Sequence, residues 1–335
     1  MDTLDALDRR VLYELDRNAS QSLSELARKI RQGRDRVEYR VERLIERKII
    51  KRFTASVNLY RLGFTIFKSY LRLENDKARV AEFVSYLRTH PRVYWLALCD
   101  GSWDLIFAVF ARNPLEFHEI HSSILSKFNP LVLNFSSYTL VDLRIYNRTY
   151  LANRGGEFVI VGGPPEDVEI DQLDFSILKL LSKDARQAAS EMAEKLDVSP
   201  QVVRYRIDRL ERQQIITGYR IDLDLARLNM LFFKTQFFLR NYQLSLRQQL
   251  RDIAAANPNI TSYIEQIGDC NVELELEVND YAQYSRIIDE IRGEHSKLVR
   301  NFQSMLVRKF YFNWVPEDMP GLVERERRSG AHAIE

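Results

Sequence analysis

The chain has 335 residues, of which 45% are hydrophobic and 29% charged, and its formal net charge is only +2. This composition predicts a soluble globular protein with room for two or more hydrophobic cores. Because no segment approaches the ~20 apolar residues of a membrane span, the N-terminus lacks a signal-peptide core and only two cysteines are present, we expect a cytoplasmic protein with no membrane partner, disulfide framework, metal or cofactor.

The sequence contains an internal duplication. A displacement of 166 residues aligns the segment that begins at Asp5 with the segment that begins at Asp171. A displacement of 167 then aligns His90–Pro91 with Asn257–Pro258 and Gly101 with Gly268. We therefore expect two copies of one structural plan.

Breaks in composition predict where the domains begin and end. Residues 152–169 contain two Gly-Gly pairs and a Pro-Pro pair, which are strong breakers, although residues 158–161 have the composition of a short strand. Residues 316–335 lack apolar periodicity and are expected to form a flexible tail. The expected domains are residues 1–53 and 170–219 as two helical heads, and residues 54–151 and 220–315 as two bodies.

Each head is predicted to contain three helices. In head 1 they span residues 4–17, 23–30 and 34–47, and the short connection before the third is typical of a helix-turn-helix. In head 2 the third helix has a good N-cap in Ser199, followed by Pro200, whereas Gly33 takes the capping position in head 1. Residues 49–53 and 215–219 follow as the expected strand of a wing.

The third helix of head 1 lies in a strongly basic segment. Residues 28–52 contain eleven Lys and Arg against four Asp and Glu, a net charge of +7. The aligned residues 194–218 contain five basic and four acidic side chains, a net charge of +1. Because phosphate neutralisation dominates affinity for duplex DNA, head 1 is expected to contribute more of any DNA binding.

Each body is predicted to have the order βαββαβ of a split ferredoxin-like unit. In body 1 the elements span residues 66–74, 77–89, 93–98, 103–110, 114–127 and 131–145. In body 2 they span residues 231–240, 244–256, 260–267, 271–278, 281–293 and 298–312. The fold class is therefore α+β, with helices on one face of each sheet and another face that needs covering.

These residues resemble one known family. Ser24–Glu25–Leu26–Ala27, Arg43–Leu44 and Ile49–Ile50 in head 1, and Arg206–Ile207–Asp208–Arg209–Leu210 in head 2, look like the heads of Lrp/AsnC (feast/famine) transcription regulators. The resemblance covers both halves and implies winged helix-turn-helix heads, ferredoxin-like (RAM-type) bodies that pair sheet against sheet, and homo-oligomers formed through those bodies. It also implies double-stranded DNA and a small effector, typically an amino acid, as partners. The tandem arrangement departs from the family, whose members usually have one head and one body.

The resemblance suggests which residues meet DNA. In a helix-turn-helix the N-terminal part of the third helix reads base edges, and nearby basic residues contact phosphates. For bases we expect Arg34, Asp35 and Arg36 in head 1, and Ser199, Gln201 and Arg204 in head 2. For phosphates we expect Arg40, Lys51 and Arg206. Arg43 and Arg209 are expected to form salt bridges within the heads instead of contacting DNA.

In the family, effectors lie near a Gly-x-x-Asp turn, and Gly101–Ser102–Trp103–Asp104 fits that turn. Gly268–Asp269–Cys270–Asn271 retains the glycine but has Asn271 in place of the aspartate. Backbone donors near a glycine can hold a carboxylate, and an aspartate can hold an ammonium group. We therefore predict that the first turn is the better amino-acid site.

Other readings remain open at this point. His118 and His121 have the i, i+3 spacing of a metal site but no visible third ligand, so surface or interface packing is the preferred interpretation. Cys99 and Cys270 are interpreted as small buried residues in preference to redox sensors. The main functional alternative is an enzyme similar to siroheme decarboxylases, which resemble the same plan and need basic and histidine side chains around a large pocket. A third is an assembly module whose heads contact only protein.

Overall fold

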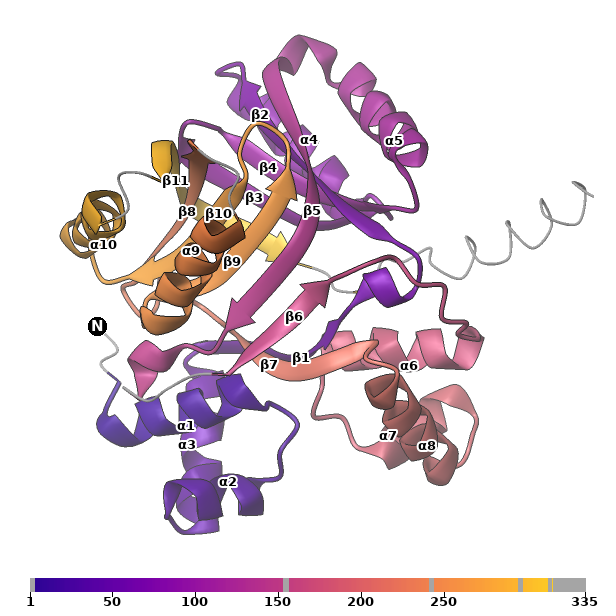
Figure 1. Cartoon of the computed structure of the whole chain (residues 1–335). Coiled ribbons are helices and arrows are strands. Elements are labelled where there is room, and N and C mark those ends of the chain that lie inside the picture. Colours follow the sequence, from indigo (N-terminus) through magenta and orange to yellow (C-terminus); the bar gives the residue numbers. More distant parts are fainter. Residues whose placement is uncertain (1–3, 153–156, 241–243, 295–297, 313–314, 316–335) are drawn as a thin grey trace, which may run out of the picture.

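The computed structural model describes residues 4–152, 157–240, 244–294, 298–312 and 315. Two helical heads lie side by side below a single β-barrel, and a two-stranded ribbon runs between the heads and the barrel (Figure 1). Within these ranges no helix combines the length and apolar character needed to cross a bilayer. The expected tail, residues 316–335, lies outside the described residues.

Each head contains the three predicted helices. Head 1 has α1 (Ala6–Arg17), α2 (Leu23–Ile30) and α3 (Arg34–Glu46), and head 2 has α6 (Gln172–Lys183), α7 (Ala189–Leu196) and α8 (Pro200–Arg212). The first helix of each head begins with a capping box, formed by Asp5 with Asp8 in α1 and by the aligned aspartates in α6. Because Asp5 is the N-cap, α1 begins at Ala6 and not at the expected residue 4.

The strands that leave the heads pair with each other. β1 (Ile50–Val57) and β7 (Ile216–Leu223) form an antiparallel ribbon, with Phe53 opposite Ile221. Each head packs on the strand of the other copy, since α1 contacts β7 and α6 contacts β1. The backbone amide of Ala19 donates to Tyr219, and that of Ala185 donates to Phe53. The two copies are therefore interlocked at the ribbon.

The two bodies form one closed barrel. Body 1 contributes β2 (Thr65–Leu73), β3 (Val93–Gly101), β4 (Leu105–Ala111) and β5 (Val132–Tyr146), and body 2 contributes β8 (Leu231–Leu239), β9 (Ile260–Ile267), β10 (Val272–Val278) and β11 (Val299–Phe312). Each body has the ferredoxin-like order, β5-β2-β4-β3 or β11-β8-β10-β9. The pairs β3–β11 and β5–β9 join the two sheets at their edges and close the ring.

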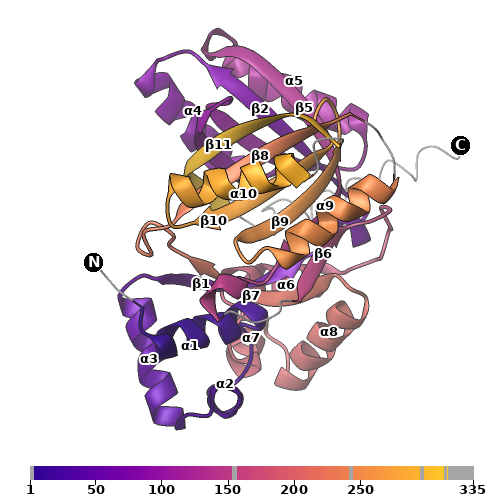
Figure 2. The same ribbon diagram turned by 60° about the vertical axis from the view of Figure 1, so that its left-hand side comes forward.

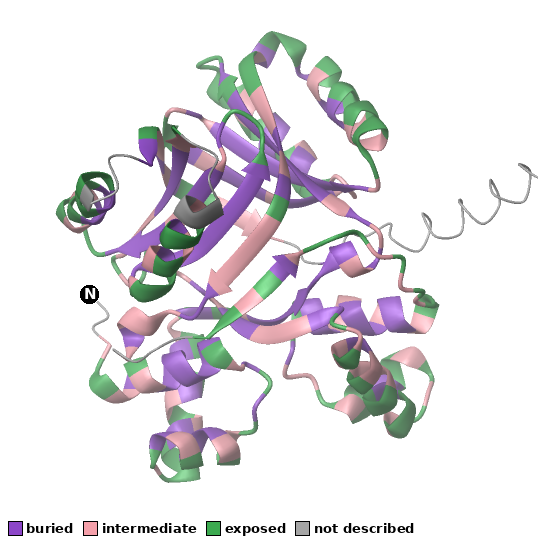
Figure 3. Ribbon diagram, in the orientation of Figure 1, coloured by how far each residue is buried: buried purple, intermediate pink, exposed green. Residues whose placement is uncertain are grey.

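Helices cover the outside of the barrel. These are α4 (Lys77–Thr89) and α5 (Pro114–Lys127) on body 1, and α9 (Leu244–Ala256) and α10 (Tyr281–Glu294) on body 2 (Figure 2). Short 3₁₀ turns are η1 (Leu59–Arg61), η2 (Asn129–Leu131) and η3 (Thr149–Leu151). The strands are largely buried and the outer faces of the helices are exposed (Figure 3). The expectation that bodies expose a sheet face for association between chains is thus wrong, because edge-to-edge closure encloses that face.

The inside of the barrel contains a buried charge cluster. Lys68 Nζ lies 2.8 Å from Glu273 Oε1, Lys234 Nζ lies at the same distance from that oxygen, and Tyr70 donates its hydroxyl hydrogen to Glu273. Burial raises the pKa of Glu273, but the charges of Lys234 and Lys68 outweigh burial and bring it down to about 2. These ion pairs join strands from both copies across the interior.

The linker also adds a strand to this sheet. β6 (Phe158–Gly162) pairs with the C-terminal half of β5, which confirms the strand expected at residues 158–161. Residues 153–156, with one of the two Gly-Gly pairs, lie outside the described residues.

Candidate nucleic-acid interface and effector turns

The third helix of each head buries one stripe and exposes its N-terminal turn. In α3, Val37, Val41 and Leu44 are buried, and in α8 Val203 and Leu210 are buried. The predicted base-reading residues are all exposed, namely Arg34, Asp35, Arg36, Ser199, Gln201 and Arg204. Ser199 accepts a hydrogen bond from the amide of Val202, whereas Gly33 supplies no side-chain cap. The start of α3 therefore keeps more free backbone donors than the start of α8.

Two arginines expected to contact phosphate are engaged within their heads. Arg40 contacts the carboxylates of Asp5 and Asp8 at 2.5 and 2.9 Å, and its side chain is 16% exposed. Arg206 contacts Asp171 at 2.7 Å in the equivalent arrangement. A hydrogen bond from the amide of Asp8, together with Arg40, holds the pKa of Asp5 below its ordinary value. These ion pairs tie the third helix to the first, and phosphate contact by Arg40 and Arg206 stays a prediction.

Arg43 and Arg209 are the residues expected to form salt bridges within the heads. Arg209 forms an ion pair with Asp174. Lys51 is the third residue expected to contact phosphate, which stays a prediction. It lies on β1, 3.9 Å from Asp222 and over the ring of Phe310, and it lines a cavity beside the barrel. Its place is on the body side of the ribbon.

One pair of surface residues was missed as candidates. Tyr39 and Tyr205 occupy equivalent positions on α3 and α8, and their side chains are 61% and 60% exposed. Each lies one helical turn after the exposed residues at the start of its helix. The displacement of 166 residues aligns Tyr39 with Tyr205, so the sequence contains this signal. Large exposed aromatic side chains on a recognition helix can contact sugars and base methyl groups.

The first predicted effector turn is packed against body 2. Gly101 has φ +129°, and a Cβ there would lie 2.4 Å from the carbonyl oxygen of Ser304. Trp103 is buried, and Asp104 accepts hydrogen bonds from the backbone of Leu73 (2.9 Å) and from Arg72 (3.2 Å). The carboxylate of Asp104 already has partners within the body, and its role in effector binding stays a prediction.

The neighbouring residues of this turn reach a cavity between the bodies. Ser102 and Asp100 line a space of about 370 Å³, together with Tyr281, Tyr284 and Asp289 of α10. At the second turn, Asn271 accepts a hydrogen bond from Leu239, as Asp104 does from Leu73. There Asp269 is exposed, and a Cβ on Gly268 would lie 2.3 Å from the ring of Tyr138. The two turns are therefore alike in backbone and different in surroundings.

Three of the four remaining side chains singled out in the sequence are packed in the body cores. Cys99 and Cys270 are both buried and free, and burial raises the pKa of each thiol to about 12. His121 is buried among Phe107, Phe117 and Phe135, and burial lowers its pKa to about 4. His118 is exposed. These environments favour packing roles for Cys99, Cys270 and His121.

A buried ion network that sequence reasoning missed joins head 1 to the barrel. Asp16, at the end of α1, contacts Arg148 (2.6 Å) and Arg220 (3.3 Å), and Arg148 also contacts Glu277 (2.8 Å). The equivalent positions in the other copy hold Ser182 and Thr54, and the Thr54 hydroxyl donates to the main-chain carbonyl oxygen of Ser182. The only sequence signal was that the charged residues have neutral counterparts in the other repeat.

Comparisons with known proteins agree with this architecture. A model of winged helix-turn-helix DNA-binding domains matches residues 4–51 and 170–217. An uncharacterised HTH-type transcriptional regulator of Pyrococcus horikoshii is 37% identical over 123 residues, which cover 35% of this chain and 79% of that protein. The HTH-type transcriptional regulator LrpB of Bacillus subtilis is 28% identical over 124 residues, covering 37% of this chain and 82% of LrpB.

One solved structure extends the comparison to the whole chain. The siroheme decarboxylase NirDL has a TM-score of 0.62 over 98% of this chain and 100% of its own, at 11% identity, which shows a common fold. Both sequence relatives described above carry the name of transcriptional regulators. The chain therefore belongs to the Lrp/AsnC family of helix-turn-helix transcriptional regulators, in a tandem duplicated form.

Proposed function

We propose that this regulator reads a specific duplex sequence with the N-terminal turns of α3 and α8. The observation that carries the proposal is that Arg34, Arg36 and Arg204 are exposed there, while Arg40 and Arg206 are held inside the heads. Because the ribbon joins both heads in one chain, a single polypeptide presents two recognition helices, as a dimer would.

The two heads are proposed to contribute unequally. The α3 segment carries a net charge of +7 and the α8 segment +1. Although Arg40, Lys51 and Arg52 of the first segment are engaged elsewhere, Arg28, Arg31, Arg34 and Arg36 remain available among the described residues. Head 1 then supplies most of the phosphate neutralisation, and head 2 adds a different base preference.

Fluorescence anisotropy with a labelled duplex from the gene's own promoter, repeated over a salt series, tests this proposal. We expect Arg34→Gln/Arg36→Gln to weaken binding more than Arg204→Gln and to lower the slope of log K against log salt by about 0.9 for each phosphate contact removed. Arg300→Gln, an exposed change on the barrel, is the control. Equal losses from the two heads would contradict the division of labour, and unchanged binding in both would contradict DNA recognition by these turns.

The effector proposal concerns the cavity at the first turn. Ser102 offers a hydroxyl there and Asp289 offers an exposed carboxylate suited to an ammonium group, whereas Asp100 is paired with Arg308. An amino acid in this space would touch both bodies and so bias their packing and the spacing of the heads. Calorimetric titration with amino acids tests binding, with Asp289→Asn expected to weaken it and Asp269→Asn, at the repeat-equivalent of Ser102, to leave it unchanged.

A second candidate function is enzymatic, and one observation favours it: the likeness to NirDL covers the whole fold. The cavity lined by Lys51 has basic and aromatic side chains, as a siroheme site would need, but its described lining includes no histidine. A visible absorption band after mixing with siroheme, with loss of carbon dioxide, would support this function.

A further inference from the structure

The third helices of the two heads agree in their middle turns and differ where they begin. The displacement of 166 residues places Tyr39, Arg40, Arg43 and Leu44 on identical residues of α8. At the start of the helix four positions differ, and the pairs are Arg34 with Pro200, Asp35 with Gln201, Arg36 with Val202 and Glu38 with Arg204. Glu38 and Pro200 are half-buried, and the other six side chains are exposed. The difference therefore falls on the turns proposed to read bases.

Both heads anchor these turns in the same way. Arg40 and Arg206 each contact the capping aspartate of the first helix in their own head, at 2.5 and 2.7 Å. The valine three residues earlier, Val37 or Val203, is fully buried in each head. Because the two third helices have the same anchors, side chains at equivalent positions project in equivalent directions. The heads present the same surface geometry with different side chains on it.

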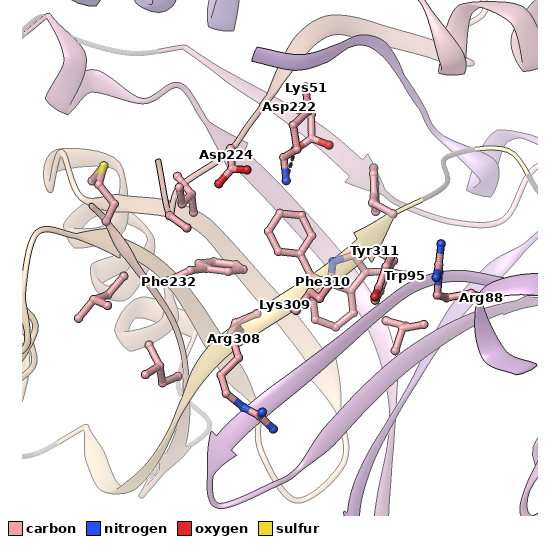
Figure 4. A pocket seen from close by; sticks show the side chains of 18 of the residues that line it. Lys51, Arg88, Trp95, Asp222, Asp224, Phe232, Arg308, Lys309, Phe310 and Tyr311 are labelled. Atoms are coloured by element: carbon pink, nitrogen blue, oxygen red, sulfur yellow. Dashed lines mark ion pairs between the residues drawn. The ribbon is translucent and has the colours of Figure 1, made fainter. Parts of the chain in front are cut away.

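The ribbon relates the two heads by an approximate two-fold axis. Thr54 of β1 pairs with Arg220 of β7, which is its own counterpart in the repeat. When a residue of an antiparallel pair meets its own counterpart, a two-fold axis passes between the strands, as in an isologous dimer. The ion pair of Lys51 with Asp222, 3.9 Å apart, also links these strands (Figure 4). Since each head packs on the strand of the other copy, the axis applies to the heads as well.

The start of α3 carries groups that suit G·C base pairs. In the major groove an arginine can donate two hydrogen bonds to guanine, and a carboxylate can accept one from the amino group of cytosine. Arg34 and Arg36 are of the first kind and Asp35 is of the second. A half-site that satisfies all three side chains is therefore rich in G·C pairs.

The start of α8 carries a different set of groups. A glutamine can form two hydrogen bonds with adenine, and an apolar side chain can contact the methyl group of thymine. Gln201 and Val202 are of these kinds, and Arg204 remains for a guanine. A half-site that satisfies this helix therefore contains A·T pairs.

We propose that the duplex site of this chain is not a palindrome. Its two half-sites are inverted relative to each other, but the half under head 1 is rich in G·C pairs and the half under head 2 contains A·T pairs. In dimers of identical chains the symmetry of the operator mirrors that of the protein. Here the backbone has the two-fold symmetry and the reading side chains do not, so the chain binds its site in one orientation. This inference rests on the proposed function and specifies the kind of site.

The test is selection of binding sites by the full chain from a library of random duplexes, followed by sequencing. The parent should enrich a non-palindromic motif. Arg34→Ala/Arg36→Ala should lose base preference only in the G·C-rich half, and Gln201→Ala/Arg204→Ala only in the other half. Each lost contact should reduce discrimination at its base pair by about five- to 140-fold, because a bidentate contact contributes roughly 1–3 kcal/mol and 1.4 kcal/mol is tenfold. All four side chains are exposed, so both variants should melt as the parent does.

An exchange variant gives the sharpest result. Arg34→Pro/Asp35→Gln/Arg36→Val/Glu38→Arg gives head 1 the reading residues of head 2, and proline is tolerated at the first position of a helix. This variant should enrich a palindrome made of two A·T-containing halves. The matched control, Ile45→Glu/Glu46→Arg, makes the same kind of exchange at exposed positions near the end of α3 and should keep the motif of the parent.

The outcomes separate this inference from the proposed function. A palindromic motif from the parent, or loss of preference in both halves in either alanine variant, would overturn the inference and leave DNA recognition in place. The parent's motif from a folded exchange variant would overturn it as well. Failure of the parent to enrich any motif would overturn the proposed function together with the inference.

Discussion

Charged residues at equivalent positions of the two copies act alike at one place and differently at another. Arg40 and Arg206 play the same part, because the aspartates of the capping boxes are present in both heads. Asp16 is different: it is fully buried with Arg148 and Arg220, whereas its counterpart Ser182 takes part in a neutral hydrogen bond. Breaking a buried ion pair by removing one partner leaves an uncompensated charge. Head 1 is thus attached to the barrel by an ion network that has no counterpart among the described residues around head 2.

Asp16 should make stability depend on acid pH. Burial alone would raise the pKa of Asp16, but Arg220 and Arg148 outweigh burial and lower it below its ordinary 3.8. Because the folded state then holds the proton less tightly than the unfolded state, this contribution is complete above about pH 4 and is lost as pH falls through the depressed pKa. We expect Asp16→Asn to cost about 3–5 kcal/mol near neutral pH and progressively less toward pH 3, measured by urea unfolding.

Ser182→Ala is the matched control, with a loss that does not vary with pH. A difference between the parent and Asp16→Asn that stays constant from pH 7 to pH 3 would contradict the assignment.

At the scale of elements, close approach between strands explains why the glycine turns are shared by both copies. The Gly101 turn touches the backbone of β11, and the Gly268 turn touches the ring of Tyr138 on β5. Both positions have positive φ, at 129° and 151°, which residues with a Cβ rarely adopt. The glycines therefore have a structural reason to be present at the joins between the bodies, besides any role near an effector.

Gly101→Ala should destabilise the protein by about 1–3 kcal/mol, because it adds backbone strain and a contact with Ser304 that a main-chain atom cannot relieve. Gly293→Ala is the same substitution in an exposed part of α10, where the added Cβ meets nothing within 4 Å. It should stabilise by up to about 1 kcal/mol, since alanine favours helix. Opposite shifts in melting temperature are expected, and a Gly101→Ala protein as stable as the parent would refute the argument.

At the scale of the whole molecule, one chain contains the contacts that a pair of identical chains would make. The heads exchange strands at the ribbon, and the sheets close into a barrel with charges from both copies inside. Further association into homo-oligomers stays a prediction. It would have to use the outer surface, because the inner faces of both sheets are enclosed.

This interlocking predicts that the chain unfolds as a single unit, although chains beyond about 250–300 residues usually split into separate domains. Differential scanning calorimetry should give one transition, with a calorimetric enthalpy close to the van't Hoff enthalpy. Two well-separated transitions, with the heads lost before the barrel, would show that the ribbon does not couple them.

The sequence by itself determined the duplication, the three helices of each head, the βαββαβ order and the exposed start of α3, because these follow from local periodicity and capping. Only the tertiary structure decided that the sheets close edge to edge, that Lys51 turns toward the body and that Arg40 turns inward. Such features depend on pairing between distant residues, as between Lys68 and Glu273, which are 205 positions apart. Local patterns constrain which face of an element is buried, but not which partner covers that face, and both the ribbon and the closed barrel are consequences of the choice of partner.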